Sequence, residues 1–236
     1  MAINKDSNGY TFLFAIVLVV VVGISLASIS IGLKPIQTKN AEIKKKMDIL
    51  GALKIDCTRD NAEEHFAKYI DLSKSVVLDA NGNPVDGVNP FDVDIKKQFR
   101  DKTLAEKDRL YPLFVGNVDG KTKYIIPMVG TGLWGPIWGY LAINDDKQSI
   151  YGAVFDHKTE TPGLGAEITT ELFTKQFVDE LISDNGQFVP FKVVKDGSGS
   201  SQQHKVDGIT GGTITSKGVE KMLNNTLAVY VKYFNK

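Results

Sequence analysis

The pattern of apolar and polar residues changes along the chain. Its first feature is a long apolar run near the amino terminus. Residues 10–33 contain no charged side chain, and residues 12–22 are almost entirely apolar. About 20 apolar residues, at ~1.5 Å each in a helix, cross the ~30 Å hydrocarbon core of a membrane. The apolar part of a cleaved signal peptide, which is the alternative, is usually ~7–15 residues long. We therefore predict an uncleaved transmembrane anchor at residues 10–33, preceded by a tail at residues 1–9.

The next stretch shows helical periodicity. Ile43, Met47 and Leu50 recur at intervals of four and three positions, which places them on one face of an α-helix. We assign residues 34–58 to a juxtamembrane helical segment. The remaining residues, 59–236, are enough for one globular domain of ordinary size.

Short runs of strand-like composition occupy the middle of this domain. They are rich in β-branched and aromatic residues and are separated by turn pairs such as Asp119-Gly120, a pattern typical of an antiparallel meander. The predicted strands are 113–118, 123–129, 137–143 and 149–155, with a further strand at 188–194. Helices are predicted at residues 59–72, 169–183 and 215–234. Helices before and after a mainly antiparallel sheet indicate the α+β class.

The amino-acid composition argues against several classes of function. Lys plus Arg and Asp plus Glu both number 28, so no net positive charge points to nucleic acid. Cys57 is the only cysteine, which excludes an internal disulfide, a cysteine-rich metal site and a cysteine-ligated iron–sulfur cluster. Asp92 and Asp94 could form a pair of carboxylates, but a solvated loop is the simpler interpretation.

A loop rich in glycine and hydroxyl groups precedes the last predicted helix. Residues 207–216 hold three glycines and four hydroxyl side chains. Glycine allows close backbone approach, and a helix start directs free N–H groups toward an anion. The loop is therefore a candidate phosphate site, although it is not a P-loop, which needs Gly-Lys-Ser/Thr. Taken alone, a turn with an N-cap at Thr215 or Ser216 explains the pattern at least as well.

Two further glycine-rich loops interrupt the strand region. Residues 130–135, Gly-Thr-Gly-Leu-Trp-Gly, combine close backbone approach with a flat apolar side chain, which suits a planar aromatic ligand. A tight bend around a core tryptophan is the alternative. Residues 160–165, Glu-Thr-Pro-Gly-Leu-Gly, contain a Pro-Gly turn. His157 precedes this loop as a candidate proton donor, and a surface histidine beside a turn is the simpler interpretation.

Residues 207–213, Asp-Gly-Ile-Thr-Gly-Gly-Thr, resemble the flavinylation motif of the FMN-binding domain family. In that motif an Asp is followed by two variable positions, Ser or Thr, Gly, Ala, and then the Thr or Ser to which a flavin transferase esterifies FMN through its phosphate. By position, the resemblance implies covalent attachment at Thr213, with Thr210 and Thr215 as the next candidates. Gly212 stands where the family usually has Ala, and the missing methyl group is expected to loosen the loop slightly.

The loops at residues 130–135 and 160–165 resemble the same family, in the same order along the chain. The resemblance implies that both loops and the flavinylation motif contact FMN. The residues so implied are Leu133, Trp134, Thr161, Gly163, Leu164, Gly165, Thr210, Gly211 and Gly212. It implies neither a metal ion nor a catalytic side chain.

The Gly-Leu-Trp run and residues 33–53 resemble the branch of the family found in Na+-translocating NADH:quinone oxidoreductases more than the branch found in the Rnf electron-transport complex. The resemblance implies an electron-relay subunit with covalent FMN, other membrane subunits as partners and a flavin transferase for maturation. An Rnf-type subunit and a flavinylated extracytosolic carrier without a pump are alternatives. A third alternative is an anchored scaffold domain without flavin, which the colour of the protein distinguishes.

The charges around the anchor and the resemblance disagree on orientation. Lysines follow the apolar run at positions 34, 39, 44, 45 and 46, whereas Lys5 and the amino terminus precede it. Read literally, the positive-inside rule places the globular domain in the cytoplasm. The family implies the opposite, because its flavin is attached on the periplasmic face. We follow the family and expect a single-pass protein of the bacterial inner membrane with a periplasmic domain.

Overall fold

The first helix carries the predicted membrane anchor. The structure is a computed structural model that describes residues 7–236, so most of the predicted tail at residues 1–9 lies outside the described residues. Helix α1 (Asn8–Ala52) is one continuous helix that includes Pro35. A window of 18 residues within it has a mean hydropathy of 3.0, and its length and composition suffice to cross a membrane. The chain divides after Lys45 into two compact units, and the last residues of α1 belong to the second.

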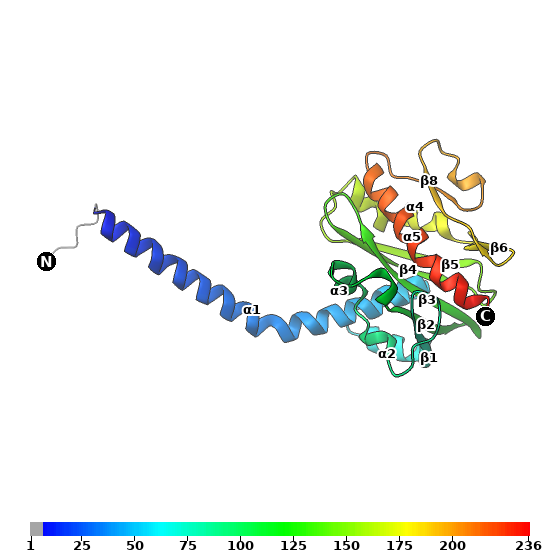
Figure 1. The fold of residues 1–236 in the computed structure, drawn as a ribbon, viewed down its shortest axis with the longest axis horizontal. Helices are drawn as coiled ribbons and strands as arrows, with labels where there is room; N and C mark the ends of the chain where they lie inside the picture. Colours follow the sequence, from blue (N-terminus) through cyan, green and yellow to red (C-terminus); the bar gives the residue numbers. More distant parts are fainter. Residues whose placement is uncertain (1–6) are drawn as a thin grey trace. The chain divides into compact units, whose positions relative to one another are not determined.

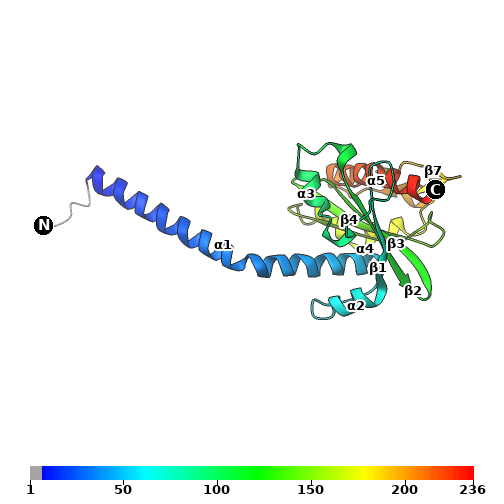
Figure 2. The same ribbon diagram turned by 60° about the horizontal axis from the view of Figure 1, so that its bottom comes forward.

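A five-stranded antiparallel sheet forms the centre of the second unit (Figure 1). Its strands lie in chain order, so each pairs with its neighbours in the sequence. They are β1 (Ile70–Leu78), β2 (Tyr111–Val118), β3 (Lys121–Thr131), β4 (Pro136–Ile143) and β5 (Ile150–His157). The predicted meander is confirmed and is extended at one edge by β1. The α+β class is confirmed as well, because helices cover both faces of the sheet (Figure 2).

The other elements, apart from the long α5, are short. The helices are α2 (Ala62–Tyr69), α3 (Ile95–Arg100), α4 (Glu171–Thr174) and α5 (Thr213–Phe234). The 3-10 turns are η1 (Pro90–Asp92), η2 (Glu106–Asp108), η3 (Gly165–Thr169), η4 (Lys175–Phe177) and η5 (Gly199–Ser201). Small strand pairs are the antiparallel β6 (Ser183–Asp184) and β7 (Gln187–Phe188) and the parallel β8 (Lys192–Val194) and β9 (Lys205–Asp207).

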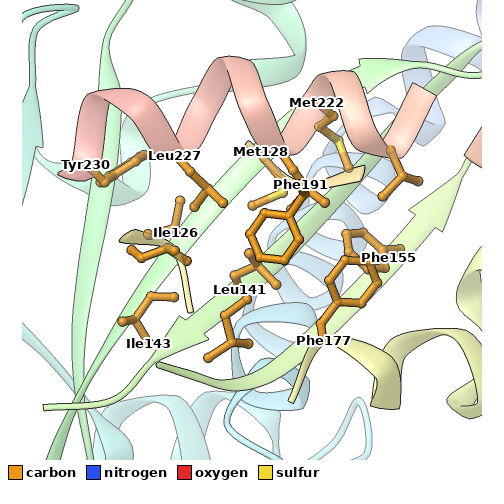
Figure 3. Packing of buried hydrophobic residues seen from close by; sticks show 14 of the residues in the cluster. Ile126, Met128, Leu141, Ile143, Phe155, Phe177, Phe191, Met222, Leu227 and Tyr230 are labelled. Carbon is orange, nitrogen blue, oxygen red and sulfur yellow. The ribbon is translucent and has the colours of Figure 1, made fainter. Parts of the chain in front are cut away.

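Two apolar clusters, one on each face, hold the sheet. Helix α5 lies across one face, where Met222 and Leu227 pack against strand residues (Figure 3). The other face is covered by the end of α1 and by α2, and Leu50 is fully buried there. Successive residues of β4 alternate between the clusters, as the pleat of a strand requires, so that Leu141 lies on the α5 side and Ala142 on the α1 side.

Two predicted helices are wrong in extent. The predicted helix at residues 59–72 ends before Ile70, which begins β1. In place of one helix over residues 169–183, the structure has the short α4 and η4, with the end of η3 before them and the start of β6 after them. The chain then runs beside the edge strand β5, where Asp179 N donates to Ile150 O at 2.9 Å. The open edge of the sheet offers unpaired backbone groups, and satisfying them outweighs the helical periodicity of this stretch.

The predicted strand at residues 188–194 is divided. Pro190 separates β7 from β8, because proline lacks the N–H that a continuous ladder needs. Strand β8 pairs instead with β9, which leads into the loop before α5. The predicted helix at residues 215–234 begins earlier than expected, at Thr213.

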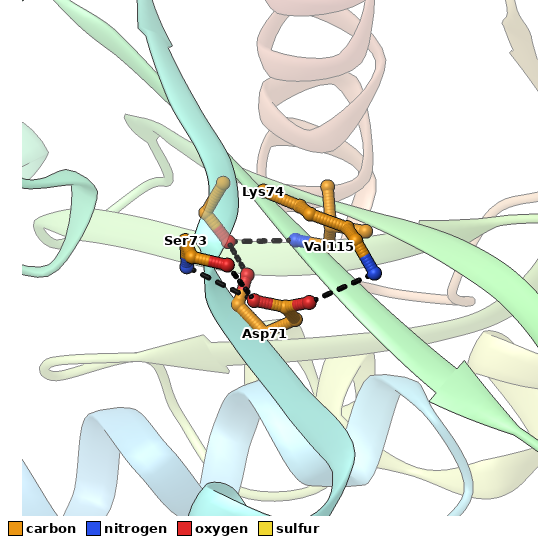
Figure 4. Close-up of polar contacts among 5 residues, drawn as sticks. Asp71, Ser73, Lys74 and Val115 are labelled. Carbon is orange, nitrogen blue, oxygen red and sulfur yellow. Dashed lines mark hydrogen bonds and ion pairs between the residues drawn. The ribbon is translucent and has the colours of Figure 1, made fainter.

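Polar contacts shape the edge strand β1 where its pairing with β2 shifts register (Figure 4). The Asp71 carboxylate accepts hydrogen bonds from the backbone N and the hydroxyl of Ser73 at 3.0 and 2.5 Å, and it pairs with Lys74 at 3.0 Å. The hydroxyl of Ser75 accepts from Val115 N at 2.9 Å and donates to Asp71 O at 2.8 Å, so it bridges the gap in the ladder. The hydrogen bond from Ser73 and the contact with Lys74 lower the pKa of Asp71 from its ordinary 3.8 to about 2.

This depressed pKa predicts an acid-sensitive sheet edge. The folded state favours the carboxylate form of Asp71, so its contribution to stability is full above the unfolded pKa near 3.8 and is lost as the pH falls toward 2. Thermal unfolding of the wild type and of Asp71→Asn, followed from about pH 6 down to about pH 2, measures this contribution. We expect the advantage of the wild type to narrow below about pH 4. A difference that does not change with pH contradicts the assignment.

Candidate functional site

The carboxylate of Glu160 joins two loops to the start of α5. Glu160 lies after β5 and is only 5% exposed. Its Oε1 accepts from the backbone N of Trp134, in the β3–β4 loop, at 2.8 Å. Its Oε2 accepts from the hydroxyl of Thr215, in the first turn of α5, at 2.5 Å. The three glycine-rich loops identified in the sequence therefore meet at one end of the sheet.

Glycines allow these close contacts. A Cβ at Gly132 would lie 2.6 Å from Glu160 Oε1. A Cβ at Gly165 would lie 2.5 Å from both Glu160 Oε2 and Thr215 Oγ1. A side chain at either glycine would thus displace the carboxylate. Residues 130–135 also have the spacing Gly-x-Gly-x-x-Gly, but they join two antiparallel strands, so no helix follows them to hold a dinucleotide pyrophosphate.

Helix α5 begins without a side-chain cap. Gly212 is its N-cap, Thr213 is its first residue, and its first turn has no acidic residue. The N-caps predicted from the sequence are wrong. The hydroxyl of Thr215 is bound to Glu160, and both groups are buried. The hydroxyl of Ser216 donates to Gly212 O at 2.9 Å. Because first-turn N–H groups lack intrahelical partners and carry the positive end of the helix dipole, this start can bind an anion.

The loop before α5 packs against Leu164. Gly211 has a φ of 75°, a conformation that favours glycine, and a Cβ there would lie 2.5 Å from Leu164 Cδ2. A Cβ at Gly212 would lie 3.0 Å from Ile209 Cγ2 and 3.1 Å from Leu164 O. These neighbours already occupy the space that a methyl group would fill. The packing therefore gives no support to the expectation that glycine loosens the loop.

The Thr161 loop is a compact turn. Leu164 N donates to Thr161 O at 3.1 Å. Gly163, with a φ of 75°, donates its N–H to Glu167 Oε1 at 2.8 Å. Thr161, Gly163 and Leu164 are exposed, whereas Gly165 is buried. The turn thus presents its outer residues to solvent and its last glycine to Glu160.

Four large apolar side chains are exposed around the start of α5. They are Leu133 (50% exposed), Trp134 (65%), Leu164 (42%) and Ile214 (58%), which we call the apolar rim. Exposed apolar side chains that gather in one place mark a ligand or partner surface. Trp134 is therefore not the core tryptophan of the alternative interpretation, and its ring is accessible to a flat ligand.

The structure brings all the residues implied by the resemblance to this end of the sheet. In the loop before α5, Thr210 and Gly211 are exposed, Gly212 is buried and Thr213 is half-buried. Sequence analysis missed Glu160 and Ile214, because a glutamate beside a Pro-Gly turn has the pattern of a solvated loop. His157, considered as a proton donor, instead accepts a hydrogen bond at Nδ1 from Glu160 N at 3.1 Å, so it supports the turn.

The uncapped helix start beside an apolar rim suits a ligand that has both a phosphate and a flat ring, as a flavin mononucleotide does. Residues 132–228 match the FMN-binding domain family. That span contains Glu160, the whole apolar rim and Thr213. The protein is thus of the FMN-binding class.

Named proteins that resemble this chain show to which family within this class it belongs. The chain is 30% identical to the C subunit of the Na(+)-translocating NADH-quinone reductase of Vibrio campbellii, over 93% of this chain and 90% of that protein. It is 33% identical to the same subunit of Vibrio vulnificus, over 92% of this chain and 89% of that protein. Its fold matches the crystal structure of the same subunit from Parabacteroides distasonis with a TM-score of 0.77 and 41% identity, covering 86% of this chain and 98% of that one. The chain belongs to the family of C subunits of Na(+)-translocating NADH-quinone reductases.

Proposed function

We propose that this chain is the membrane-anchored electron-relay subunit of a Na+-translocating NADH:quinone oxidoreductase, with FMN joined to Thr213 by a phosphoester. One observation carries the proposal: α5 starts without a side-chain cap at Thr213, inside the apolar rim. The family membership supports the kind of complex, and the site offers a place for the phosphate next to a place for the ring.

The helix start supports Thr213 as the acceptor. A phosphate esterified to its hydroxyl would lie at the positive end of α5, within reach of first-turn N–H groups. The other two candidate threonines lack either an accessible hydroxyl or a position in the first turn of the helix. Thr215 is 1% exposed, and its hydroxyl is already bound to Glu160. Thr210 is exposed but precedes the helix, so it has no first-turn position.

The apolar rim supports a place for the flavin ring. Bound FMN supplies the electron transfer, while the protein supplies position and electrostatics. Glu160 fixes the backbone of the Trp134 loop and leaves the Trp134 side chain exposed. The ring would thus lie against the exposed apolar side chains of the rim, with an edge open toward a neighbouring subunit.

Maturation and topology follow from the same proposal. The exposed Thr210 and Gly211 leave the loop accessible to a flavin transferase, which would attach FMN to the half-buried Thr213. The other membrane subunits of the complex would be the electron-transfer partners. The domain would lie on the periplasmic side of the bacterial inner membrane. This orientation opposes the lysines that follow the apolar run, so it depends on the family and not on charge.

The mass of the intact chain, purified from its own cells, tests the proposal. We expect an increase equal to one FMN less one water, located in the peptide that contains Thr213. The natural source matters, because a heterologous product made without the flavin transferase would carry no flavin in any case. A colourless chain of unmodified mass from its own membrane would leave only an anchored domain without flavin.

A further inference from the structure

A cavity lies at the end of the sheet opposite the apolar rim. It has a volume of about 440 Å³, and its lining includes Lys54, Lys121, Lys123, Asn144 and Tyr151. Strand β3 runs from this cavity at Lys121 to the flavin loop at Thr131. At ~3.3 Å per residue the two ends are roughly 30 Å apart, so the cavity is not part of the proposed flavin site.

Two lysine ammonium groups converge on one aromatic ring in this cavity. Lys123 is only 4% exposed, and its Nζ lies 4.4 Å from the centre of the Tyr151 ring. The Nζ of Lys54, which follows the end of α1, lies 4.7 Å from the same centre. Within residues 7–236, the ion pairs include neither lysine.

Hydrogen bonds to neutral side chains compensate the positive charge of Lys123 only in part. Its Nζ donates to Asn144 Oδ1 at 2.6 Å, which uses one of the three N–H donors of an ammonium group. Asn144 Nδ2 donates in turn to the hydroxyl of Ser149 at 2.9 Å, and that hydroxyl donates to Asp146. The nearest carboxylate of this network is therefore reached through two neutral side chains. A buried cation without a direct counter-ion is costly, so the site favours an added anion.

We propose that this cavity binds a phosphate group through the ammonium groups of Lys54 and Lys123. Ammonium groups bind phosphate as point charges, and two of them match the charge of a phosphate dianion. The volume lies within the range of sites for small molecules. Two carboxylates, Asp119 and Asp179, line the cavity together with three lysines, so the lining carries one net positive charge, which suits a single phosphate group better than a long polyanion such as a nucleic acid. The ligand is thus a free phosphate compound or the phosphate of a lipid headgroup.

Titration of the full-length chain in a phosphate-free detergent solution with inorganic pyrophosphate tests the proposal. The thermal unfolding midpoint and the phosphorus NMR linewidth report binding, and sodium chloride at equal ionic strength is the control for screening. We expect pyrophosphate, and not chloride, to raise the midpoint. Lys123→Met keeps the unbranched stem and should weaken the apparent affinity at least about tenfold, since a charge-assisted contact is lost. Lys195→Met, at an exposed loop position, should titrate like the wild type.

Two further measurements keep the result interpretable. If Lys123→Met does not fold, Lys54→Met removes the other ammonium group from an exposed side chain and should weaken binding in the same direction. Titration with short-chain phosphatidic acid in the same assay tests whether the bound phosphate belongs to a lipid headgroup or to a free compound. If Lys123→Met weakens the binding of phosphatidic acid but not of pyrophosphate, the ligand is a lipid headgroup. Equal titration of Lys123→Met and Lys195→Met with both pyrophosphate and the lipid, or an effect that chloride reproduces, overturns the site. The flavin content should stay unchanged in both cavity variants.

Discussion

Replacement of Thr213 by alanine is expected to abolish covalent flavin while leaving the domain folded. The substitution removes the only hydroxyl at the first position of α5, but it keeps a Cβ in a half-buried place. No side chain caps this helix in the described structure, so no cap is lost, and the change in the free energy of unfolding should stay within about 0.5 kcal/mol. The measurements are ultraviolet fluorescence of the denatured band and the mass of the intact chain, both from cells that contain the flavin transferase.

The neighbouring hydroxyls supply the controls for this experiment. Thr213→Ser keeps an acceptor hydroxyl and should retain flavin. Thr210→Ala changes an exposed residue of the same loop and should retain it as well. Thr215→Ala is a poor control, because it also breaks the buried contact with Glu160. Fluorescence that persists in Thr213→Ala would move the ester to another residue and would refute the proposed attachment.

Replacement of Glu160 by alanine is expected to have the largest effect on stability. The substitution leaves two partners without their acceptor, the backbone N–H of Trp134 and the buried hydroxyl of Thr215. Hydrogen bonds to charged groups contribute ~1.5–3 kcal/mol each, so the loss of two is expected to lower the free energy of unfolding by roughly 3–6 kcal/mol. Chemical denaturation of the full-length chain, followed by tryptophan fluorescence, measures the loss.

Replacement of an exposed glutamate is the control that distinguishes the loss of these two hydrogen bonds from the loss of a negative charge in general. Glu171 pairs with Lys175 at 2.7 Å, but its side chain is 75% exposed, so Glu171→Ala should change the free energy by no more than about 0.5 kcal/mol. Glu160→Ala should also lower the amount of covalent flavin, because the loops that form the site are no longer joined. Wild-type stability of Glu160→Ala would show that packing alone holds the three loops together.

Local patterns were sufficient for the central strands. The β2–β3 hairpin turns at Asp119 and Gly120, whose φ values of 53° and 78° are those that a tight hairpin turn requires. Strands β2, β3 and β4 are buried along most of their length because both faces of the sheet are covered, so what marks them in the chain is a run of β-branched and aromatic residues bounded by turn pairs. The same reasoning failed at residues 169–183, because backbone hydrogen bonds hold residues 179–182 against the edge at β5. No local periodicity carries information about that edge.

The site was predictable to the extent that it resembles a known motif. Thr213 and the glycines around it could be named from the sequence by that resemblance, although the attachment itself stays a prediction. Glu160 could not be named, because its partners Trp134 and Thr215 lie 26 and 55 positions away. The start of α5 was also misplaced, since hydroxyls expected as caps are used by other contacts.

The sequence by itself determined the apolar helix, the meander and the hydroxyl-rich loop before the last helix. Each of these depends on neighbouring residues: on an uninterrupted apolar run, on β-branched and aromatic runs bounded by turn pairs, or on glycines that relax the backbone. Only the tertiary structure decided that Glu160 joins the loops and that Lys123 is buried beside Tyr151. The reason is physical. Burial and charge pairing arise when distant segments pack against one sheet, and a linear pattern does not record which segments will meet.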